Sequence, residues 1–315
     1  MIRLNSYQAE SGLMPDNTGL RIRTVLFATD LSDGSSIVLN WAAAIASTYK
    51  AKLALVHVFD PGNAGNWTDS SSSDLRNLAN VAKTELERVG QSLLAAQGIT
   101  SEIIVRYGNV RDAIFQVQHE LSAEMVVLGS SGKKTHQPKF LGSIAEAILR
   151  EMRCGVVTVG PRVSQRPFSS NPQIILFPTD FSASSLAALP AAISLALDLC
   201  ADLALLHVCN PYESHSCFEH QATCRKNLAA IAEQVGKQRI PVEQFLESGV
   251  IAERCLYLAK EKTADFIVMG VRHGDLEDGT RLHGTVADLI REAPCPIFTL
   301  AHQANAGLSK PLLHC

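Results

Sequence analysis

The sequence is poor in the features that would place it in a specialised class of protein. Its first twenty residues lack the basic start and continuous apolar core of a secretory signal peptide, so we expect a cytoplasmic location. The eight cysteines are scattered without close pairs, which favours reduced thiols over a disulfide framework. Basic charge is not in excess either, because the formal net charge is −3, and this argues against nucleic-acid and anionic-membrane partners.

Long hydrophobic runs are scarce as well. One apolar stretch extends from Leu186 to Cys209, and it is interrupted by Pro190, Asp198 and Asp202. Charged side chains make insertion into a bilayer costly, so we interpret this stretch as a buried helix that leads into a strand. We therefore expect no membrane partner.

Apolar residues are abundant: they make up 46% of the 315 residues, enough for two domains with ordinary cores. Short apolar runs alternate with longer segments of helical periodicity. In the first half, strands are expected at 24–28, 53–58, 102–106, 126–128 and 156–159, with helices at 35–49, 74–97, 110–121 and from 142 to about 152. This alternation predicts a parallel, doubly wound α/β sheet.

The first half of the chain recurs in the second half. Asp30 and Asp180 are 150 positions apart, and so are the His-Val pairs that begin at His57 and His207. Because no gap is needed across that span, the chain carries a duplication of whole domains. The expected organisation is a flexible leader (1–20), a first domain (21–161), a linker (162–172), a second domain (173–303) and a C-terminal tail (304–315).

A glycine-rich stretch follows the fourth predicted strand of the first half. Gly129 and Gly132 permit close approach of the backbone, and Gly142 and Ser143 open the next helix. The N-terminus of a helix offers backbone N–H groups and a favourable dipole to an anion. The stretch predicts a phosphate-binding loop, while the alternative is a strand-to-helix turn that uses glycine for geometry alone.

Four motifs occur in the same order in both halves. They are Thr-Asp-x-Ser after the first strand, Leu-x-His-Val in the second, a glycine loop after the fourth, and Cys-x-Val/Ile-x-Thr in the last. In the first half the glycine loop is Gly-x2-Gly-x9-Gly-Ser. Together these motifs resemble the universal stress protein family, and the sequence is similar to a tandem member of it. The resemblance implies two tandem Rossmann-like doubly wound domains, each a five-stranded parallel sheet of strand order 3-2-1-4-5 flanked by helices.

The resemblance also implies how the two halves associate. Family dimers often pair through their last strands, which here are 156–159 and 297–300. Duplication within one chain would let the halves supply this pairing to each other as an intramolecular pseudo-dimer, and two chains could form a further homodimer. Such pairing would cover two exposed sheet edges.

By resemblance, the first domain binds ATP, with Mg²⁺ as a candidate companion, in a stress-response protein. The adenosine part would contact Asp30 and Val58, and the glycine loop would enclose ribose and phosphates. Asp30 could equally cap the following helix, and Val58 could simply pack in the core. The candidate nucleotide-binding residues are Ala28, Asp30, Val58, Leu128, Gly129, Gly132, Gly142, Ser143 and Ile144.

The second domain departs from this pattern. Three residues separate Gly270 from Gly274, and the loop contains Asp275, Glu277 and Asp278, which would repel phosphate in the absence of a divalent metal. An ungapped overlay places histidines at the glycine positions, whereas a shift of one residue aligns Gly284-Thr285 with Gly142-Ser143. In either alignment we expect weak or no ATP binding. The degenerate site comprises Pro178, Asp180, Val208, Gly270, Gly274, Gly284 and Thr285.

One group of residues lies outside the family pattern. It consists of His215, Cys217, His220 and Cys224, whose soft ligands could hold a thiophilic metal, although the expected outcome is incidental packing and no metal. His57 and His207 are expected to be structural, and Cys154 and Cys295 to be small buried residues.

Two other functions stay open at this point. One is a slow ATPase, for which a Gly-x4-Gly-Lys-Ser/Thr loop and an evident catalytic base are missing. The other is a nucleotide-free scaffold, or a metal or redox sensor that uses the cysteines and histidines of the second domain.

Overall fold

The structure is a computed structural model, and it describes residues 20–32, 34–60, 72–131, 141–164, 167–168, 173–209, 217–272 and 284–302. The predicted leader, apart from Leu20, and the predicted tail lie outside these ranges.

Strands and helices alternate through the first half, as the sequence pattern predicts. The elements are β1 (Thr24–Ala28), α1 (Ser35–Tyr49), β2 (Lys52–Phe59), α2 (Ser72–Gln97), β3 (Ser101–Tyr107), α3 (Val110–Leu121), β4 (Met125–Gly129), α4 (Ser143–Glu151) and β5 (Gly155–Val159).

The second half repeats this order with one helix divided in two. Its elements are β6 (Ile174–Pro178), α5 (Ala183–Ala187), α6 (Leu189–Leu199), β7 (Asp202–Cys209), α7 (Cys217–Gly236), β8 (Val242–Ser248), α8 (Ile251–Glu261), β9 (Phe266–Arg272), α9 (Thr285–Glu292) and β10 (Ile297–His302). The long apolar stretch is the helix α6 followed by the strand β7, which confirms that interpretation. Within the described ranges, no helix is both long and apolar enough to cross a membrane.

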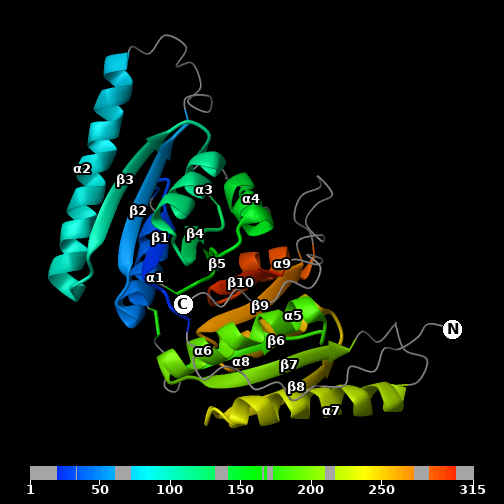
Figure 1. Cartoon of the computed structure of the whole chain (residues 1–315). Coiled ribbons are helices and arrows are strands. Elements are labelled where there is room, and N and C mark those ends of the chain that lie inside the picture. Colours follow the sequence, from blue (N-terminus) through cyan, green and yellow to red (C-terminus); the bar gives the residue numbers. More distant parts are fainter. Residues whose placement is uncertain are drawn as a thin grey trace.

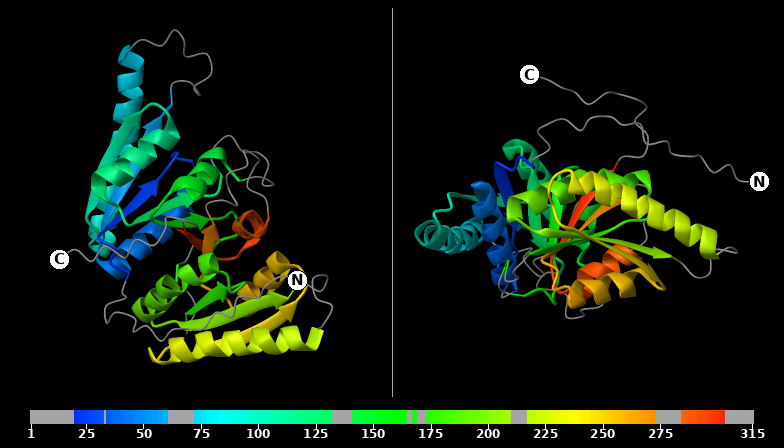
Figure 2. Two further views of the ribbon diagram at one scale, coloured as in Figure 1. Left: turned by 45° about the vertical axis from the view of Figure 1, so that its right-hand side comes forward. Right: turned by 90° about the horizontal axis from the view of Figure 1, so that it is seen from below.

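All ten strands belong to one sheet of order β3-β2-β1-β4-β5-β10-β9-β6-β7-β8. Each half by itself has the order 3-2-1-4-5, so the predicted fold class is confirmed. The halves join where β5 pairs antiparallel with β10, with Val157 opposite Phe298. Figure 2 shows β10 lying between β5 and β9 in the middle of the molecule. The predicted pairing of the two last strands within one chain is therefore present.

Helices cover both faces of the sheet and form two apolar cores. On one face α1, α2, α6 and α7 pack over inward residues such as Val25, Phe27 and Leu205. On the other face α3, α4, α8 and α9 pack over the alternating residues, including Leu26 and Leu206. Both cores continue from one half into the other, and the long helices α2 and α7 lie along the outer strands β3 and β8 (Figure 1). Strands buried on both faces explain the continuous apolar runs of the sequence.

Proline divides the first helix of the second half. The corresponding helix of the first half, α1, continues from Ser35 to Tyr49, whereas α5 ends at Ala187 and α6 begins at Leu189. Pro190 stands in the first turn of α6, where its missing N–H costs least. The break turns α5 into a separate short helix beside β9.

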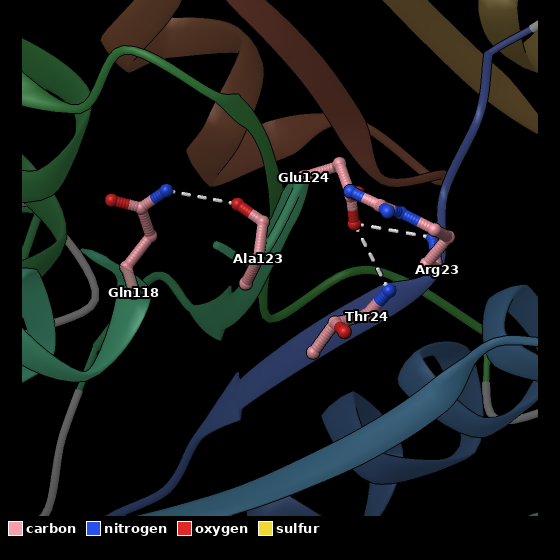
Figure 3. Close-up of polar contacts among 5 residues, drawn as sticks. All are labelled: Arg23, Thr24, Gln118, Ala123 and Glu124. Carbon is pink, nitrogen blue, oxygen red and sulfur yellow. Dashed lines mark hydrogen bonds and ion pairs between the residues drawn. The ribbon is translucent and has the colours of Figure 1, made fainter. Parts of the chain in front are cut away.

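A carboxylate fixes β1 beside β4 at their amino ends. The Glu124 carboxylate accepts hydrogen bonds from the backbone N–H groups of Arg23 (3.1 Å) and Thr24 (3.0 Å) and from the Arg23 guanidinium (2.9 Å) (Figure 3). Nearby, the Gln118 side chain donates to the Ala123 carbonyl just before β4. The second half uses Asp265 in the same way, since its carboxylate accepts from the Ile174 N–H at 3.0 Å. Both halves thus lock their central strands into register.

The first prediction concerns this carboxylate. Burial alone raises the pKa of Glu124, but the hydrogen bonds from Arg23 and Thr24 outweigh it, and the net pKa is lowered. A lowered folded-state pKa contributes stability above the ordinary pKa of glutamate, about 4.3, and that stability is lost as the pH falls through the folded-state value. Because Glu124 is 26% exposed, we expect Glu124→Gln to cost only about 1 kcal/mol at pH 7.

Urea unfolding of wild type and Glu124→Gln at pH 7 and at pH 3 measures this difference. The gap in unfolding free energy should shrink at the lower pH. A matched control is Glu87→Gln, which removes an exposed pair with Lys83 and should cost less than about 0.5 kcal/mol at both pH values. A gap for Glu124→Gln that stays constant or grows at low pH would contradict this role.

Candidate nucleotide-binding site

The predicted site residues gather where the strand order reverses. β1 lies between β2 and β4, and its last residue Ala28 pairs with Leu128 in β4. Ligands of open α/β sheets bind outside the carboxyl ends of the strands at such a reversal. Asp30 follows β1, and Gly129 is the last residue of β4, so the fold brings together residues about a hundred positions apart in sequence. We call this region the switch-point site.

Asp30 shapes the turn that leads out of β1. Its carboxylate accepts hydrogen bonds from the Ser32 backbone N–H (3.0 Å) and the Ser35 hydroxyl (2.9 Å). Asp180 forms the same turn in the second half, accepting from the Ser182 N–H at 2.9 Å. Asp30 does not cap α1 as the sequence alternative suggested, because the N-cap residue is Gly34 and no side chain caps this helix. Asp30 holds the turn before the helix instead, and this role is shared by both halves. This shared role orients one carboxylate at each switch point.

The amino end of α4 lies on the other side of the switch point. The Gly142 N–H donates to the Ser130 carbonyl at 2.8 Å, which draws the two ends of the glycine loop together. Gly142 is the N-cap residue and has no side chain with which to cap the helix, and Ser143 is exposed. An α-helix leaves its first N–H groups without intrahelical partners, and these attract anions. Gly132, which belongs to the predicted loop, lies outside the described residues.

Apolar residues supply the wall of the switch-point site. Leu128 is buried, while Ala28, Val58 and Ile144 are partly exposed and pack against the core beneath α3 and α4. Partly exposed apolar side chains beside backbone donors suit a ligand that combines a flat ring with phosphates. The structure brings the described members of the predicted set together on this side of the sheet.

In the corresponding region of the second half, the side of the sheet next to α5 is filled. A Cβ atom on Gly270 would overlap the backbone carbonyl of Ser184 in α5, whereas a Cβ on Gly129 would make ordinary contacts, the nearest with Val38 at 3.4 Å. β9 also continues past Gly270 to Arg272, so the strand does not stop at the glycine as β4 does. The short helix α5 thus lies against the strand at the position where the first half has its glycine turn.

The entry into the last helix differs between the halves as well. Gly284 has φ 90°, a conformation that favours glycine, whereas its counterpart Gly142 has φ −66°. Pro178, Asp180, Val208 and Thr285 stand at their expected places in the second half, and Gly274 and the three loop carboxylates lie outside the described residues. The two switch points therefore present different backbone surfaces.

The two histidines that recur between the halves, His57 and His207, serve the fold. His57 Nδ1 lies 2.8 Å from the Thr29 carbonyl, and His207 Nδ1 lies 2.7 Å from the Thr179 carbonyl. Each imidazole thus ties its strand to the end of the neighbouring strand, as expected for structural histidines. Burial raises the pKa of the Cys154 thiol to about 12 and also raises the pKa of the Cys295 thiol, so both are poor nucleophiles at neutral pH.

The predicted metal candidates are only partly brought together. His220 Nε2 and Cys224 Sγ are 3.6 Å apart on α7. His215 lies outside the described residues. Cys217 is the first residue of α7, but its side chain is also outside the part that the structure describes. The neighbours of His220 and Cys224 are instead His207 and Cys209 on β7, which sequence reasoning did not group with them. Their His-x-Cys spacing, which places two ligands on one face of a strand, was the available signal.

A depression in the described surface lies elsewhere. It is lined by Arg23, Lys50 and Lys52 at the amino ends of β1 and β2. This is the edge of the sheet opposite to the switch point, and the Arg23 guanidinium is already held by Glu124. Its position at the amino ends of the strands does not support it as the principal ligand site.

Comparison with known proteins agrees with the fold and the repeat. The sequence model of the universal stress protein family matches residues 21–160 and 172–300. A Staphylococcus aureus (strain USA300) protein assigned to that family is 24% identical over 153 residues, which covers 48% of this chain and 91% of the bacterial protein. One such relative therefore corresponds to a single half of this chain.

Solved structures match both halves at once. A universal stress protein from Archaeoglobus fulgidus DSM 4304 has a TM-score of 0.71 at 22% identity, covering 89% of this chain and 99% of that one. A Pseudomonas aeruginosa UCBPP-PA14 protein assigned to the family has a TM-score of 0.61 at 17% identity, covering 90% and 95%. At these identities the likeness establishes the fold.

Proposed function

Because the chain belongs to the universal stress protein family, we propose that it is a cytoplasmic stress-response protein whose first half binds ATP at the switch-point site. The family places the chain in the stress-response class. The observation that carries the ATP proposal is the glycine-led amino end of α4 beside the turn held by Asp30.

Each part of the site has a role in this proposal. The Asp30 carboxylate accepts a hydrogen bond from the nucleoside, and the apolar wall with Val58 and Leu128 takes the adenine ring. The loop from Gly129 and the first N–H groups of α4, from Ser143 and Ile144, hold the phosphates, with Mg²⁺ as their counterion. Backbone donors and the helix dipole fit the charge of a nucleotide phosphate.

In the proposal the second half provides structure and not a second nucleotide site. The backbone of Ser184 occupies the space next to Gly270, and the entry to α9 through Gly284 differs from the entry to α4. We take residues 21–161 and 173–303 as the two domains. A homodimer of the whole chain would need a surface other than β5 and β10, because these strands already pair with each other.

The second prediction tests the phosphate subsite. Ser143→Glu places a carboxylate in the first turn of α4, where it favours the helix dipole by about 0.3–1 kcal/mol but repels bound phosphates. At a few ångströms this repulsion amounts to about 1–3 kcal/mol, so ATP affinity should fall roughly 10- to 100-fold. Because Ser143 is exposed, thermal stability should stay equal or rise slightly.

The matched control is Thr285→Glu, the same change at the start of α9. Isothermal titration of full-length protein with ATP and with adenosine compares the variants. Ser143→Glu should weaken ATP binding much more than adenosine binding, and Thr285→Glu should leave both unchanged. Equal losses in the two variants, or no loss in Ser143→Glu, would rule out α4 as the phosphate subsite.

A further inference from the structure

Four soft ligands converge between β7 and α7. His207 and Cys209 are two residues apart on the strand and share one of its faces, while His220 and Cys224 are four apart on the helix. One ligand atom from each of the four side chains lies within 4.8 Å of all the others. The four side chains come from two separate elements, a strand and a helix. Their convergence is therefore not a consequence of residue spacing along a single helix.

The distances are close to those of a tetrahedral metal site. With Zn–S bonds of about 2.3 Å and Zn–N bonds of about 2.0–2.1 Å, the ligand atoms of a tetrahedral zinc ion are about 3.3–3.8 Å apart. The 3.6 Å between Cys224 Sγ and His220 Nε2 already falls in this interval. The remaining pairs are at most 4.8 Å apart, so they need to approach by about 1.5 Å at most, which side-chain rotation can supply.

His207 is oriented as a metal-bound histidine would be. With Nδ1 donating to the Thr179 carbonyl at 2.7 Å, the lone pair of the neutral ring is on Nε2. The Phe181 ring stacks on the imidazole, with centroids 4.4 Å apart and planes at 27°, and this holds the ring in place. A hydrogen bond from the other ring nitrogen to a carbonyl is the usual second-shell support of a histidine ligand.

The first half supplies a comparison within the same molecule. His57 makes the same contact to a threonine carbonyl, so that contact alone requires no metal. The residue in the place of Cys209 is Phe59, whose ring packs 4.6 Å from His57. Ala82, Leu86 and Leu93 of α2 are buried, and the residues 142 positions later in α7 are buried too. This alignment places Ala82 opposite Cys224 in the repeat. The thiols are thus additions of the second half and not part of the repeated core.

We propose that His207, Cys209, His220 and Cys224 form a tetrahedral zinc site in the second half. Two thiolates and two imidazoles select a thiophilic ion over Mg²⁺ or Ca²⁺. On binding, each thiol loses its proton to solvent as its sulfur forms a bond to zinc, so two protons leave for each ion bound and no electron is transferred. His220 is exposed and gives the ion a path of entry, while Cys209 and Cys224 are buried. The ion fastens the first turns of α7 to the end of β7.

The test uses full-length protein without an affinity tag, kept reduced and freed of metal with a chelator. Zinc is then titrated in competition with a chromogenic chelator, and Co²⁺ is used as a spectroscopic substitute. We expect one zinc per chain, and with Co²⁺ the intense visible bands of a tetrahedral site together with sulfur-to-cobalt charge transfer. Cys209→Ser, Cys224→Ser and His220→Ala should each lower zinc affinity by at least about 100-fold.

Two controls keep the outcome interpretable. Cys200→Ser changes an exposed cysteine outside the cluster and should bind zinc as the wild type does. His220→Ala alters an exposed position, so its loss of zinc binding does not depend on core disruption, and circular dichroism checks its fold. The proposal is overturned if the wild type binds less than stoichiometric zinc or if binding survives both serine variants.

Discussion

Replacing Trp41 with alanine is expected to lower the free energy of unfolding of the whole chain by about 3–5 kcal/mol. Trp41 belongs to α1 in the first half and is 2% exposed. Its indole packs edge-on against Phe168, between the halves, and against Phe266 in β9, with centroid distances of 5.5 and 5.4 Å. The indole N–H also donates to the Ser164 carbonyl at 3.0 Å.

This side chain therefore connects three parts of the molecule. Trp41→Phe keeps an aromatic ring and loses the hydrogen bond and part of the volume, so it should cost only about 1–2 kcal/mol. Urea unfolding followed by circular dichroism, which does not depend on tryptophan fluorescence, measures both variants. A cost below about 1 kcal/mol for Trp41→Ala would mean that the contact between the halves contributes little to stability.

Gly270→Ala is expected to destabilise the protein by about 3 kcal/mol or more, since overpacking against rigid neighbours reaches such values. The added methyl group would overlap the backbone carbonyl of Ser184, and backbone in α5 cannot move aside as a flexible side chain does. The matched change in the first half is Gly129→Ala, whose methyl group meets Val38 at 3.4 Å and should cost less than about 1 kcal/mol.

The comparison of these two glycines tests whether α5 fills the space beside Gly270 at the second switch point. Thermal and urea unfolding of both variants should give a clear difference in the stated direction. Equal costs would show that α5 does not fill the space beside β9 at Gly270.

The sequence predicted the order of elements because strands covered on both faces have continuous apolar runs, as Val25 to Phe27 and Val126 to Leu128 do. The pairing of β5 with β10 was predicted through the family resemblance. In this pairing Gly155 faces the ring of Phe298, and a Cβ atom placed on the glycine would lie 2.5 Å from that ring. The carboxylate contacts of Glu124 and Asp265 were not predicted, because one lone acidic residue before a strand has no distinctive pattern.

The cluster on β7 and α7 shows where sequence reasoning failed. It grouped His220 and Cys224 with residues just before them in the chain, since local spacing was the only geometry available. The actual neighbours, His207 and Cys209, come into contact only because α7 folds back along the sheet. The packing of α5 against β9 was missed for a similar reason. The Gly270 motif was compared by spacing, whereas the space beside it is taken by α5, a short helix that ends before the first turn of α6, where Pro190 stands.

The most direct test of the central claim is to count nucleotide sites in the intact chain. Equilibrium dialysis of full-length protein with labelled ATP, after denaturation of a parallel sample to identify and remove any nucleotide that copurifies, gives the number bound per chain. The account predicts one ATP per chain, held by the first half. Two equivalent sites, or no saturable binding, would contradict it.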